Sequence, residues 1–501
     1  VDFGGWGGGA ADEMGGNYYD RVLQKYGSIA GVWAPQTNRR LLSWGFNTIG
    51  PYSHYLTFPI TTNSSWPGGT QPVKMPFVWL ESITPYAETN LNNWAPGPTK
   101  SIYRGVNPSY YPNGGDFPDV FDPNFDAYVN ANIANDVNGV AGVLGSPWLM
   151  GVMIDDTDNL MGFGAGADFP TEPIDNPSPH LGWITLITAP TQTINPFTDQ
   201  PYTDTTVYTK LALANFLQSR YGTIQALNAA WGSNYTTFGS SGGWGVGTGL
   251  LDEDGRHSSW VGTDPYGLSN ANPAVKADLN AFLFQLASKY YSIMSTRLKQ
   301  HDPNVLYFGP STTGGWRSPA HAPIIQAASQ YVDVFSTSLD ASDQARLNFV
   351  AQNLGDKPMI YWEGMYANPD SSRWRYPNPN PGSPYAYDTQ SARGQGYAND
   401  LSSYVNMVAA PTGSIPSAGL IYWDWADSLG EETNWGLVTL MDNAYDGKES
   451  TISGGTPGVV GSAACADPWG FPCGGEEHNY GDFIDSVRNA NLNALETASG
   501  H

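Results

Sequence analysis

The feature that most constrains this chain is a regular alternation of short apolar runs with longer amphipathic stretches. Seven apolar runs end in polar or aromatic side chains, and they cover 46–50, 77–81, 149–156, 305–309, 332–336, 358–363 and 419–424. Between them, the spacing of apolar residues predicts helices at 18–40, 124–140, 206–231, 275–301 and 480–498. Strands that alternate with helices pack as a parallel sheet, so the pattern predicts an α/β fold.

A (β/α)8 TIM barrel with long loops on its catalytic face is the simplest arrangement of these elements. Its eighth strand would lie between residues 80 and 150 or in the run 183–187. Such a barrel can use several hundred residues as one domain. We therefore expect residues 1–501 to form a single catalytic barrel domain, with a Pro- and Gly-rich excursion at 452–476 before the closing helix.

The charge balance narrows the range of partners. The 501 residues include 22 Lys and Arg against 46 Asp and Glu, a formal net charge of −24. Nucleic-acid binders need a basic face that neutralises phosphates, and this chain is too acidic to form one. The chain also lacks an apolar run of about 18 residues, so we expect no membrane-spanning helix. Neutral polymers and small neutral ligands fit this composition, and the oligomeric state is left open.

Two cysteines, Cys465 and Cys473, flank a short Pro- and Gly-containing loop. A disulfide between them is expected in an oxidising compartment, and two unpaired thiols are the alternative. Val1 opens a Gly-rich stretch without the basic and apolar regions of a signal peptide. We therefore expect a processed form of a secreted or periplasmic protein.

Aromatic and acidic residues gather at the predicted strand ends. In a β/α barrel the active site lies at the carboxyl ends of the strands and on the loops that follow them. Aromatic rings can stack on the apolar faces of sugar rings, and carboxylates can bind hydroxyls and act as acids or bases. The combination predicts a carbohydrate substrate. The candidate substrate-binding residues are His54, Trp79, Glu81, Asp155, Trp316, Arg317, Asp340, Trp423 and Trp425.

Several of these residues have a structural alternative. His54 either binds a sugar hydroxyl or is a structural histidine, and Glu81 either contacts substrate or forms a buried ion pair. Trp423 and Trp425 alternate with Asp424 on the last predicted strand. Side chains two residues apart on a strand share a face, so both tryptophans are expected to line the site.

Glycoside hydrolysis needs two carboxyl groups, about 5–5.5 Å apart when configuration is retained and about 6.5–9.5 Å apart when it is inverted. Glu363 ends an apolar, aromatic strand, which makes it the candidate nucleophile. The alternative is a structural carboxylate paired with Arg317 or Arg373.

The candidate general acid lies in the cluster that contains Asp155, Asp156 and Asp158. Carboxylates this close repel one another, which raises at least one pKa and favours a protonated acid. A calcium site or a helix cap are the alternatives, and the spacing does not choose among the three residues. No cofactor and no other metal site is implied, because the chain has no Gly-rich phosphate loop after a strand and no His/Cys cluster with zinc spacing.

A set of short motifs occurs in one order along nearly the whole chain, at 17–19, 25–27, 40–50, 118–123, 147–151, 227–232, 301–309, 358–363, 390–397, 423–427 and 434–437. This ordered set resembles the β-agarases of glycoside hydrolase family 50 and, more distantly, the β-galactosidases of family 42. The resemblance implies a secreted, retaining β-glycosidase on a β/α barrel, with an agarose- or galactan-like substrate. It also implies Glu363 as the nucleophile and a tryptophan of the last strand below the terminal sugar.

One departure from those families concerns the acid/base. Where they have Asp-Asn-Glu, this chain has Asp155, Asp156 and Thr157. A threonine hydroxyl does not act as a general acid near neutral pH, so we favour Asp158, followed by Asp156. Two alternatives follow from the departure: a carbohydrate-binding protein on an altered barrel, and a hydrolase of another linkage that uses the Asp cluster in an inverting arrangement.

Overall fold

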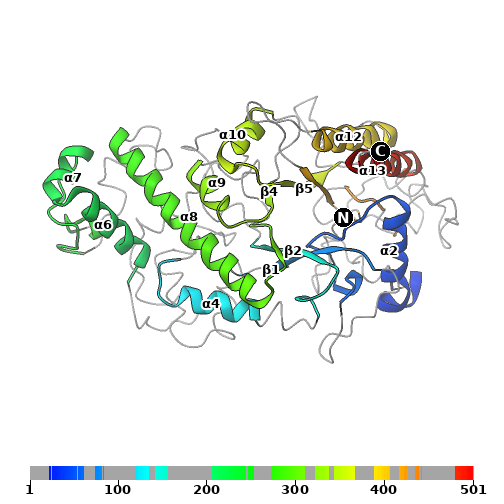
Figure 1. Cartoon of the computed structure of the whole chain (residues 1–501), viewed down its shortest axis with the longest axis horizontal. Coiled ribbons are helices and arrows are strands. Elements are labelled where there is room, and N and C mark those ends of the chain that lie inside the picture. Colours follow the sequence, from blue (N-terminus) through cyan, green and yellow to red (C-terminus); the bar gives the residue numbers. More distant parts are fainter. Residues whose placement is uncertain are drawn as a thin grey trace, which may run out of the picture.

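The computed structural model of the chain describes residues 22–23, 25–53, 55–60, 74–81, 83, 119–134, 142–155, 206–243, 246–252, 272–310, 322–337, 344–366, 387, 389–406, 417–423, 425–426, 435–438, 442 and 480–499. Parallel strands alternate with helices along the chain (Figure 1). The α/β class predicted from the apolar runs is confirmed for these residues.

The strands pair with their neighbours in chain order. One parallel sheet contains β1 (Phe77–Glu81), β2 (Leu149–Ile154) and β3 (Leu306–Tyr307), and a second contains β4 (Phe335–Thr337), β5 (Met359–Met365) and β6 (Ser417–Trp423). The amides of Asp333 and Val334 donate to the carbonyl of Tyr307 at 2.8 and 3.3 Å, which joins the two sheets. A parallel bridge between Ile49 and Phe77 adds the first predicted strand before β1.

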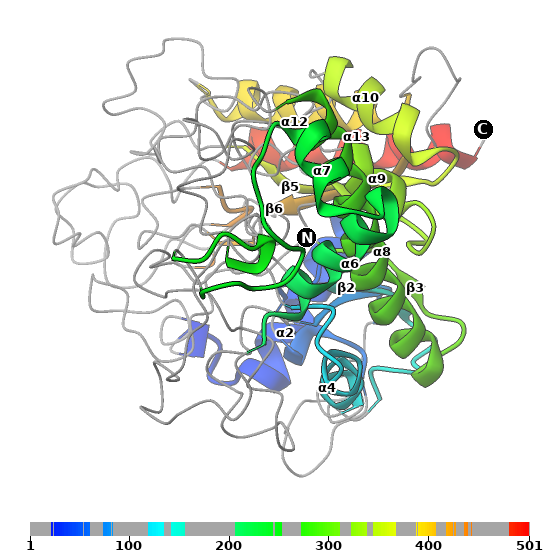
Figure 2. The same ribbon diagram turned by 90° about the vertical axis from the view of Figure 1, so that its left-hand side faces the viewer.

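Helices connect these strands. They are α2 (Ala34–Ser43), α4 (Phe125–Asn132), α6 (Tyr208–Tyr221), α7 (Ile224–Trp231), α8 (Pro273–His301), α9 (Ala322–Ala328), α10 (Gln344–Leu354), α12 (Gln390–Val405) and α13 (Gly481–Ser499), with a π turn η1 (Ile29–Trp33) and 3-10 turns η2 (Tyr55–Thr57) and η6 (Leu250–Asp252). Helices α8 and α9 lie side by side in both views, as do α12 and α13 (Figures 1 and 2).

Local sequence explains several helix ends. Helix α8 begins where Asn272 accepts from the amide of Ala274 and Pro273 occupies the first turn. The predicted helix 206–231 is divided in two, because Gly222 has a left-handed φ of 72° and Thr223 caps α7. The predicted first helix ends at Ser43 rather than 40.

Two layers of apolar side chains lie on the two faces of the strands. The inner cluster takes one buried residue from each strand or from the position next to it: Val78, Met153, Phe308, Val334, Ile360 and Ile421. The outer cluster fills the space between strands and helices. Gly151 belongs to the inner side, where a β-carbon would stand 2.6 Å from Phe308 Cε1.

The described strands do not close into a complete ring. Direct pairing of β1 with β2 and of β2 with β3 leaves no place for a further strand between them. The run 183–187 and most of the stretch between β1 and β2, where the eighth strand was expected, lie outside the described residues. Ring contacts bring the first segment beside the last strand: Tyr52 lies 5.4 Å from Trp423, and Phe46 lies 6.3 Å from Tyr422, centroid to centroid.

The closing helix is confirmed as α13, and its Asn491 donates to the carbonyl of Trp44 at 2.9 Å. This bond ties the end of the chain to α2. Among the helices that the structure describes, none is both long and apolar enough to cross a bilayer. The excursion 452–476, with Cys465 and Cys473, lies outside the described residues.

Candidate active site

The carboxyl ends of the strands form one edge, because all described pairings are parallel. Glu81 ends β1, Asp155 follows β2, and Trp423 ends β6. Glu363 lies two residues before the end of β5. Candidates from four strands therefore meet at the edge where β/α folds bind their substrates.

Glu363 lies in an irregular part of β5. Tyr361 pairs with Leu420, and Gly364 pairs with Tyr422. Between these two pairs β5 advances by three residues and β6 by two, so β5 has one extra residue. The extra residue falls at 362–363, and the side chains of these two residues lie outside the described part of the structure. Bulges are more frequent next to active sites than elsewhere in sheets, and there they can redirect a side chain.

The bulge is tightly packed on its β6 side. A β-carbon on Gly364 would stand 3.0 Å from Leu420 Cδ2 and 3.4 Å from the carbonyl oxygen of Ile421. Only a glycine lets the two strands approach this closely without displacing Leu420. The backbone that carries Glu363 is therefore confined by its neighbour.

Asp155 has a left-handed backbone, with φ of 70°, and it is fully buried. Its Oδ1 accepts from the amide of Ile83 at 2.7 Å, and its Oδ2 accepts from the hydroxyl of Tyr290 at 2.6 Å. Its own amide donates to the carbonyl of Glu81 at 2.8 Å. Both carboxylate oxygens therefore accept from protein donors, where a sugar contact was expected. We call Asp155, with its partners Ile83, Glu81 and Tyr290, the clamp, because it joins the ends of β1 and β2.

Tyr290 contributes to this clamp from helix α8. Burial, followed by the neighbouring carboxylate of Asp155, raises the pKa of Tyr290 well above its ordinary value. The phenol therefore stays protonated and donates to Asp155 at every ordinary pH. Tyr128 adds to the same corner by donating to the carbonyl of Ile83 at 3.0 Å.

Trp79 and Glu81 point from the same face of β1. The indole Nε1 of Trp79 lies 3.5 Å from Glu81 Oε2, and its ring lies 5.5 Å from that of Phe58. Glu81 is only 2% exposed, whereas Trp79 is half-buried. Of this pair, the tryptophan ring is the part that solvent reaches.

Trp423, the last residue of β6, and Trp425 do not share a face. Trp423 is half-buried and packs edge-on against Tyr52, beside the inner cluster. Trp425 is fully buried, and its ring stacks on Trp44 with 5.7 Å between centroids. A side chain without exposed surface cannot stack on a sugar, so the expectation for Trp425 is wrong. Strand β6 ends at Trp423, and the two-residue alternation ends with it.

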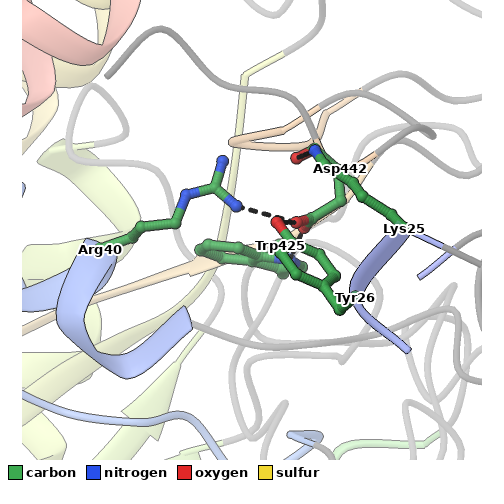
Figure 3. A network of polar contacts seen from close by, with 5 residues as sticks. All are labelled: Lys25, Tyr26, Arg40, Trp425 and Asp442. Carbon is green, nitrogen blue, oxygen red and sulfur yellow. Dashed lines mark hydrogen bonds and ion pairs between the residues drawn. The ribbon is translucent and has the colours of Figure 1, made fainter. Parts of the chain in front are cut away.

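Trp425 instead belongs to a polar network around Asp442 (Figure 3). Asp442 Oδ2 accepts from Arg40 Nη1 at 2.9 Å and from the hydroxyl of Tyr26, while Oδ1 accepts from the indole of Trp425 at 3.2 Å. Lys25 donates to the Asp442 carbonyl at 2.6 Å. The network fastens the chain after the last strand to the first helices.

The remaining candidates lie outside the described residues. These are His54, Asp156, Asp158, Trp316, Arg317 and Asp340. Within the part of the chain that the structure describes, no group of three or more His, Cys, Asp or Glu side chains is placed to hold a metal ion.

Sequence reasoning missed the roles of two residues around the edge. Tyr290 and Arg393 make contacts that hold the strand ends, and each depends on a partner far away in the chain. Asp442 alone had a local signal, because the sequence Asp442-Asn443-Ala444-Tyr445-Asp446-Gly447 indicates a turn. Its φ of 55° agrees with that interpretation.

The chain is similar to known agarases in sequence. It is 24% identical to β-agarase A of Vibrio sp. (strain JT0107) over 439 residues, which are 85% of this chain and 36% of that protein. It is also 24% identical to β-agarase B of the same strain over 442 residues, 86% of this chain and 37% of that protein. The chain thus spans little more than a third of the length of these relatives. No family model matches it.

The likeness extends to solved structures. An exo-β-agarase superposes with a TM-score of 0.61 at 19% identity, covering 97% of this chain and 50% of that one. The agarase AgWH50C superposes with a TM-score of 0.59 at 19% identity, covering 95% of this chain and 51% of that one. The chain therefore has the fold of these solved agarases.

Proposed function

We propose that this chain is a glycoside hydrolase that cleaves β-glycosidic bonds in an agarose-like galactan, or in its oligosaccharides, with retention of configuration. The observation that carries the proposal is the similarity to two β-agarases over 85% and 86% of the chain. The place of Glu363, in a bulge at the carboxyl edge of parallel strands, supports a catalytic role for this residue.

In this proposal Glu363 is the nucleophile. Its carboxylate attacks the anomeric carbon and forms a glycosyl-enzyme ester while the glycosidic oxygen leaves with a proton from the acid/base. The same acid/base then takes a proton from water, which attacks the ester and frees Glu363. No cofactor enters this scheme, and the substrate is the only partner that it requires.

The acid/base is Asp158 or Asp156. Asp155 is not available for this role, because Tyr290 and Ile83 occupy its two carboxylate oxygens in the interior. An aspartate is one methylene shorter than the glutamate of the families that the chain resembles. The chain after β2 must therefore approach the substrate more closely than it does in those families.

We also propose that the strands close into a barrel and that the protein acts outside the cytoplasm. The contacts of Tyr52 with Trp423 and of Phe46 with Tyr422 support closure between the first segment and β6. The first segment and β6 are the two ends of the described row of strands, so a further strand that closes the barrel would lie between them in space. We propose a secreted or periplasmic location, because an intact polysaccharide is too large to enter the cytoplasm.

The test compares wild type with Glu363→Gln on agarose, β-galactans, other β-linked polysaccharides and aryl β-glycosides. We expect wild type to release reducing ends from an agarose-like galactan and Glu363→Gln to lose several orders of magnitude in rate, since an amide is a poor nucleophile. Glu496→Gln, on the exposed face of α13, is the matched control and keeps full activity. Full activity of Glu363→Gln would remove the assignment.

Configuration is tested separately. Proton NMR of the first product formed identifies its anomer before mutarotation. A β-anomer supports the retaining mechanism, and an α-anomer supports the inverting alternative in which the Asp cluster acts on water.

Thr157 favours one second candidate, a carbohydrate-binding protein without turnover, because it stands where the families that the chain resembles have glutamate. Calorimetry with agaro-oligosaccharides separates the two candidates. Binding without product by wild type supports the second candidate and contradicts the first.

A further inference from the structure

A buried arginine contacts the chain directly after the strand that carries Glu363. Arg393 lies in the first turn of α12 and is fully buried. Its Nε donates to the carbonyl oxygen of Tyr366 at 2.7 Å. Tyr366 is the first residue after β5 and follows Glu363 by three positions.

The rest of the guanidinium holds the neighbouring strand and the segment beside it. Its Nη2 lies 2.9 Å from the hydroxyl of Tyr422, 2.7 Å from the carbonyl of Trp435 and 2.8 Å from the carbonyl of Gly436. Tyr422 in turn donates to the same Trp435 carbonyl at 2.6 Å. One face of the guanidinium covers the ring of Phe483, 3.8 Å from its centroid.

These contacts need the shape of an arginine. A guanidinium is a planar fork with donors in fixed directions, so it can hold two strands in a defined relation. Gly364 of β5 pairs with Tyr422 of β6, and both strands are held by Arg393 at this level. The bulge at 362–363 lies directly before this point.

We propose that Arg393 is a positioning residue for the reaction assigned to Glu363. By binding the Tyr366 carbonyl and the Tyr422 hydroxyl together, it fixes the end of β5 against β6 and keeps the bulge in the backbone that carries Glu363. Arg393 itself does not contact substrate. The inference rests on the proposed function, and its test separates the two.

The first variant is Arg393→Lys, which keeps the charge and loses the fork. We expect kcat on the agarose-like substrate to fall about 100-fold with little change in KM, because a small displacement of a reacting group has an effect of this size. The acidic limb of the kcat/KM profile shifts as well, since the surroundings of the Glu363 carboxylate change.

Tyr397→Phe is the matched control. Tyr397 lies one turn further along α12, is buried, and donates to Asn491 of α13. This variant removes a buried hydrogen bond between α12 and α13 and keeps the ring, which packs against Tyr366 and Tyr422. We expect it to lower the unfolding temperature and to leave kcat and the pH profile unchanged.

A second variant, Arg393→Ala, tests directly whether the guanidinium group is required. Guanidinium ion added to this variant should restore part of the lost kcat, and methylammonium should not. The inference is overturned if Arg393→Lys has the same kcat as Tyr397→Phe at a temperature where both are folded.

Hydrogen exchange gives a readout that needs no substrate. We expect the amides at 361–366 to exchange faster in Arg393→Lys than in wild type and Tyr397→Phe. If wild type hydrolyses none of the substrates, the proposed function fails. If exchange at 361–366 is the same in Arg393→Lys as in wild type, the positioning role of Arg393 is overturned, whether or not the protein is active. Faster exchange in an enzyme whose kcat is unaffected also overturns the inference.

Discussion

Arg40 and Asp442 form a buried ion pair, with 2.9 Å between Nη1 and Oδ2, across 402 positions of the chain. The guanidinium lies close to two stacked indole rings, 5.2 Å from the centroid of Trp44 and 5.1 Å from that of Trp425. The pair therefore connects α2 to the segment after β6 (Figure 3).

Breaking this pair is expected to destabilise the whole fold. Asp442→Asn leaves the Arg40 charge in the interior without its carboxylate, which typically costs about 3–5 kcal/mol. The free energy of unfolding, measured with urea, gives the size of the effect. Asp126→Asn is the control, because its ion pair with Arg297 is partly exposed and is worth about 0–1 kcal/mol. Equal losses in the two variants would contradict a structural role for the Asp442 network.

The clamp at Asp155 predicts a contrast between two buried tyrosines. Tyr290→Phe leaves Asp155 Oδ2 without its donor, so we expect a loss of about 1–3 kcal/mol in the free energy of unfolding, together with lower activity. Tyr307→Phe is the matched control, since the Tyr307 hydroxyl is buried without a hydrogen-bond partner among the described residues. We expect it to be nearly neutral. The interpretation fails if Tyr307→Phe is the more harmful change.

The loop before α8 predicts an acid-dependent loss of stability. Burial alone would raise the pKa of Asp252, but hydrogen bonds from Ser240, Ser241 and Gly249 outweigh it and lower the pKa from 3.8 to about 2. The folded chain therefore favours the carboxylate. This stabilisation is fully present above the unfolded pKa and is lost as the pH falls through the folded value.

Urea unfolding between neutral pH and pH 2 measures this dependence. We expect wild type to lose stability more steeply on acidification than Asp252→Asn, which cannot ionise. Asp356→Asn, at an exposed turn after α10, should follow the wild-type curve. A wild-type curve parallel to that of Asp252→Asn contradicts the prediction.

Gly151 is expected to be sensitive to a single methyl group. A β-carbon there would stand 2.6 Å from Phe308 Cε1 and 2.7 Å from the carbonyl oxygen of Leu306. Gly151→Ala should therefore lower the free energy of unfolding by about 1–3 kcal/mol through overpacking between β2 and β3. Gly239→Ala is the control, because among the described residues its β-carbon would meet only Thr237 Oγ1, at 3.7 Å. The measurement is thermal unfolding of both variants.

Strand order could be predicted from the sequence, and strand closure could not. Runs such as 77–81 and 358–363 are apolar, and such runs are typical of strands buried on both faces. Where a strand lies in a sheet depends on pairing, which no local pattern contains. The direct pairing of β1 with β2 is one such relation, and it leaves no place for a further strand between them.

The candidate site was predictable at the level of strand ends and not of individual contacts. Alternation placed Trp425 beside Trp423, but the strand ends at Trp423 and the next residues enter the outer core. Asp155 was expected to face the substrate, and its left-handed backbone instead turns it toward Tyr290. Such conformations are rare for residues other than glycine, so a sequence pattern seldom indicates them.

The most direct test of the account is to find where a sugar becomes attached during turnover. Wild-type protein is mixed with an activated 2-fluoro-β-galactoside, which forms the ester quickly and hydrolyses it slowly, and is then digested and analysed by mass spectrometry. We predict a mass increase of one fluoroglycosyl unit on Glu363, absent in Glu363→Gln. Stable labelling at an aspartate, or an active enzyme that accumulates no ester, would contradict the assignment of Glu363 as the nucleophile.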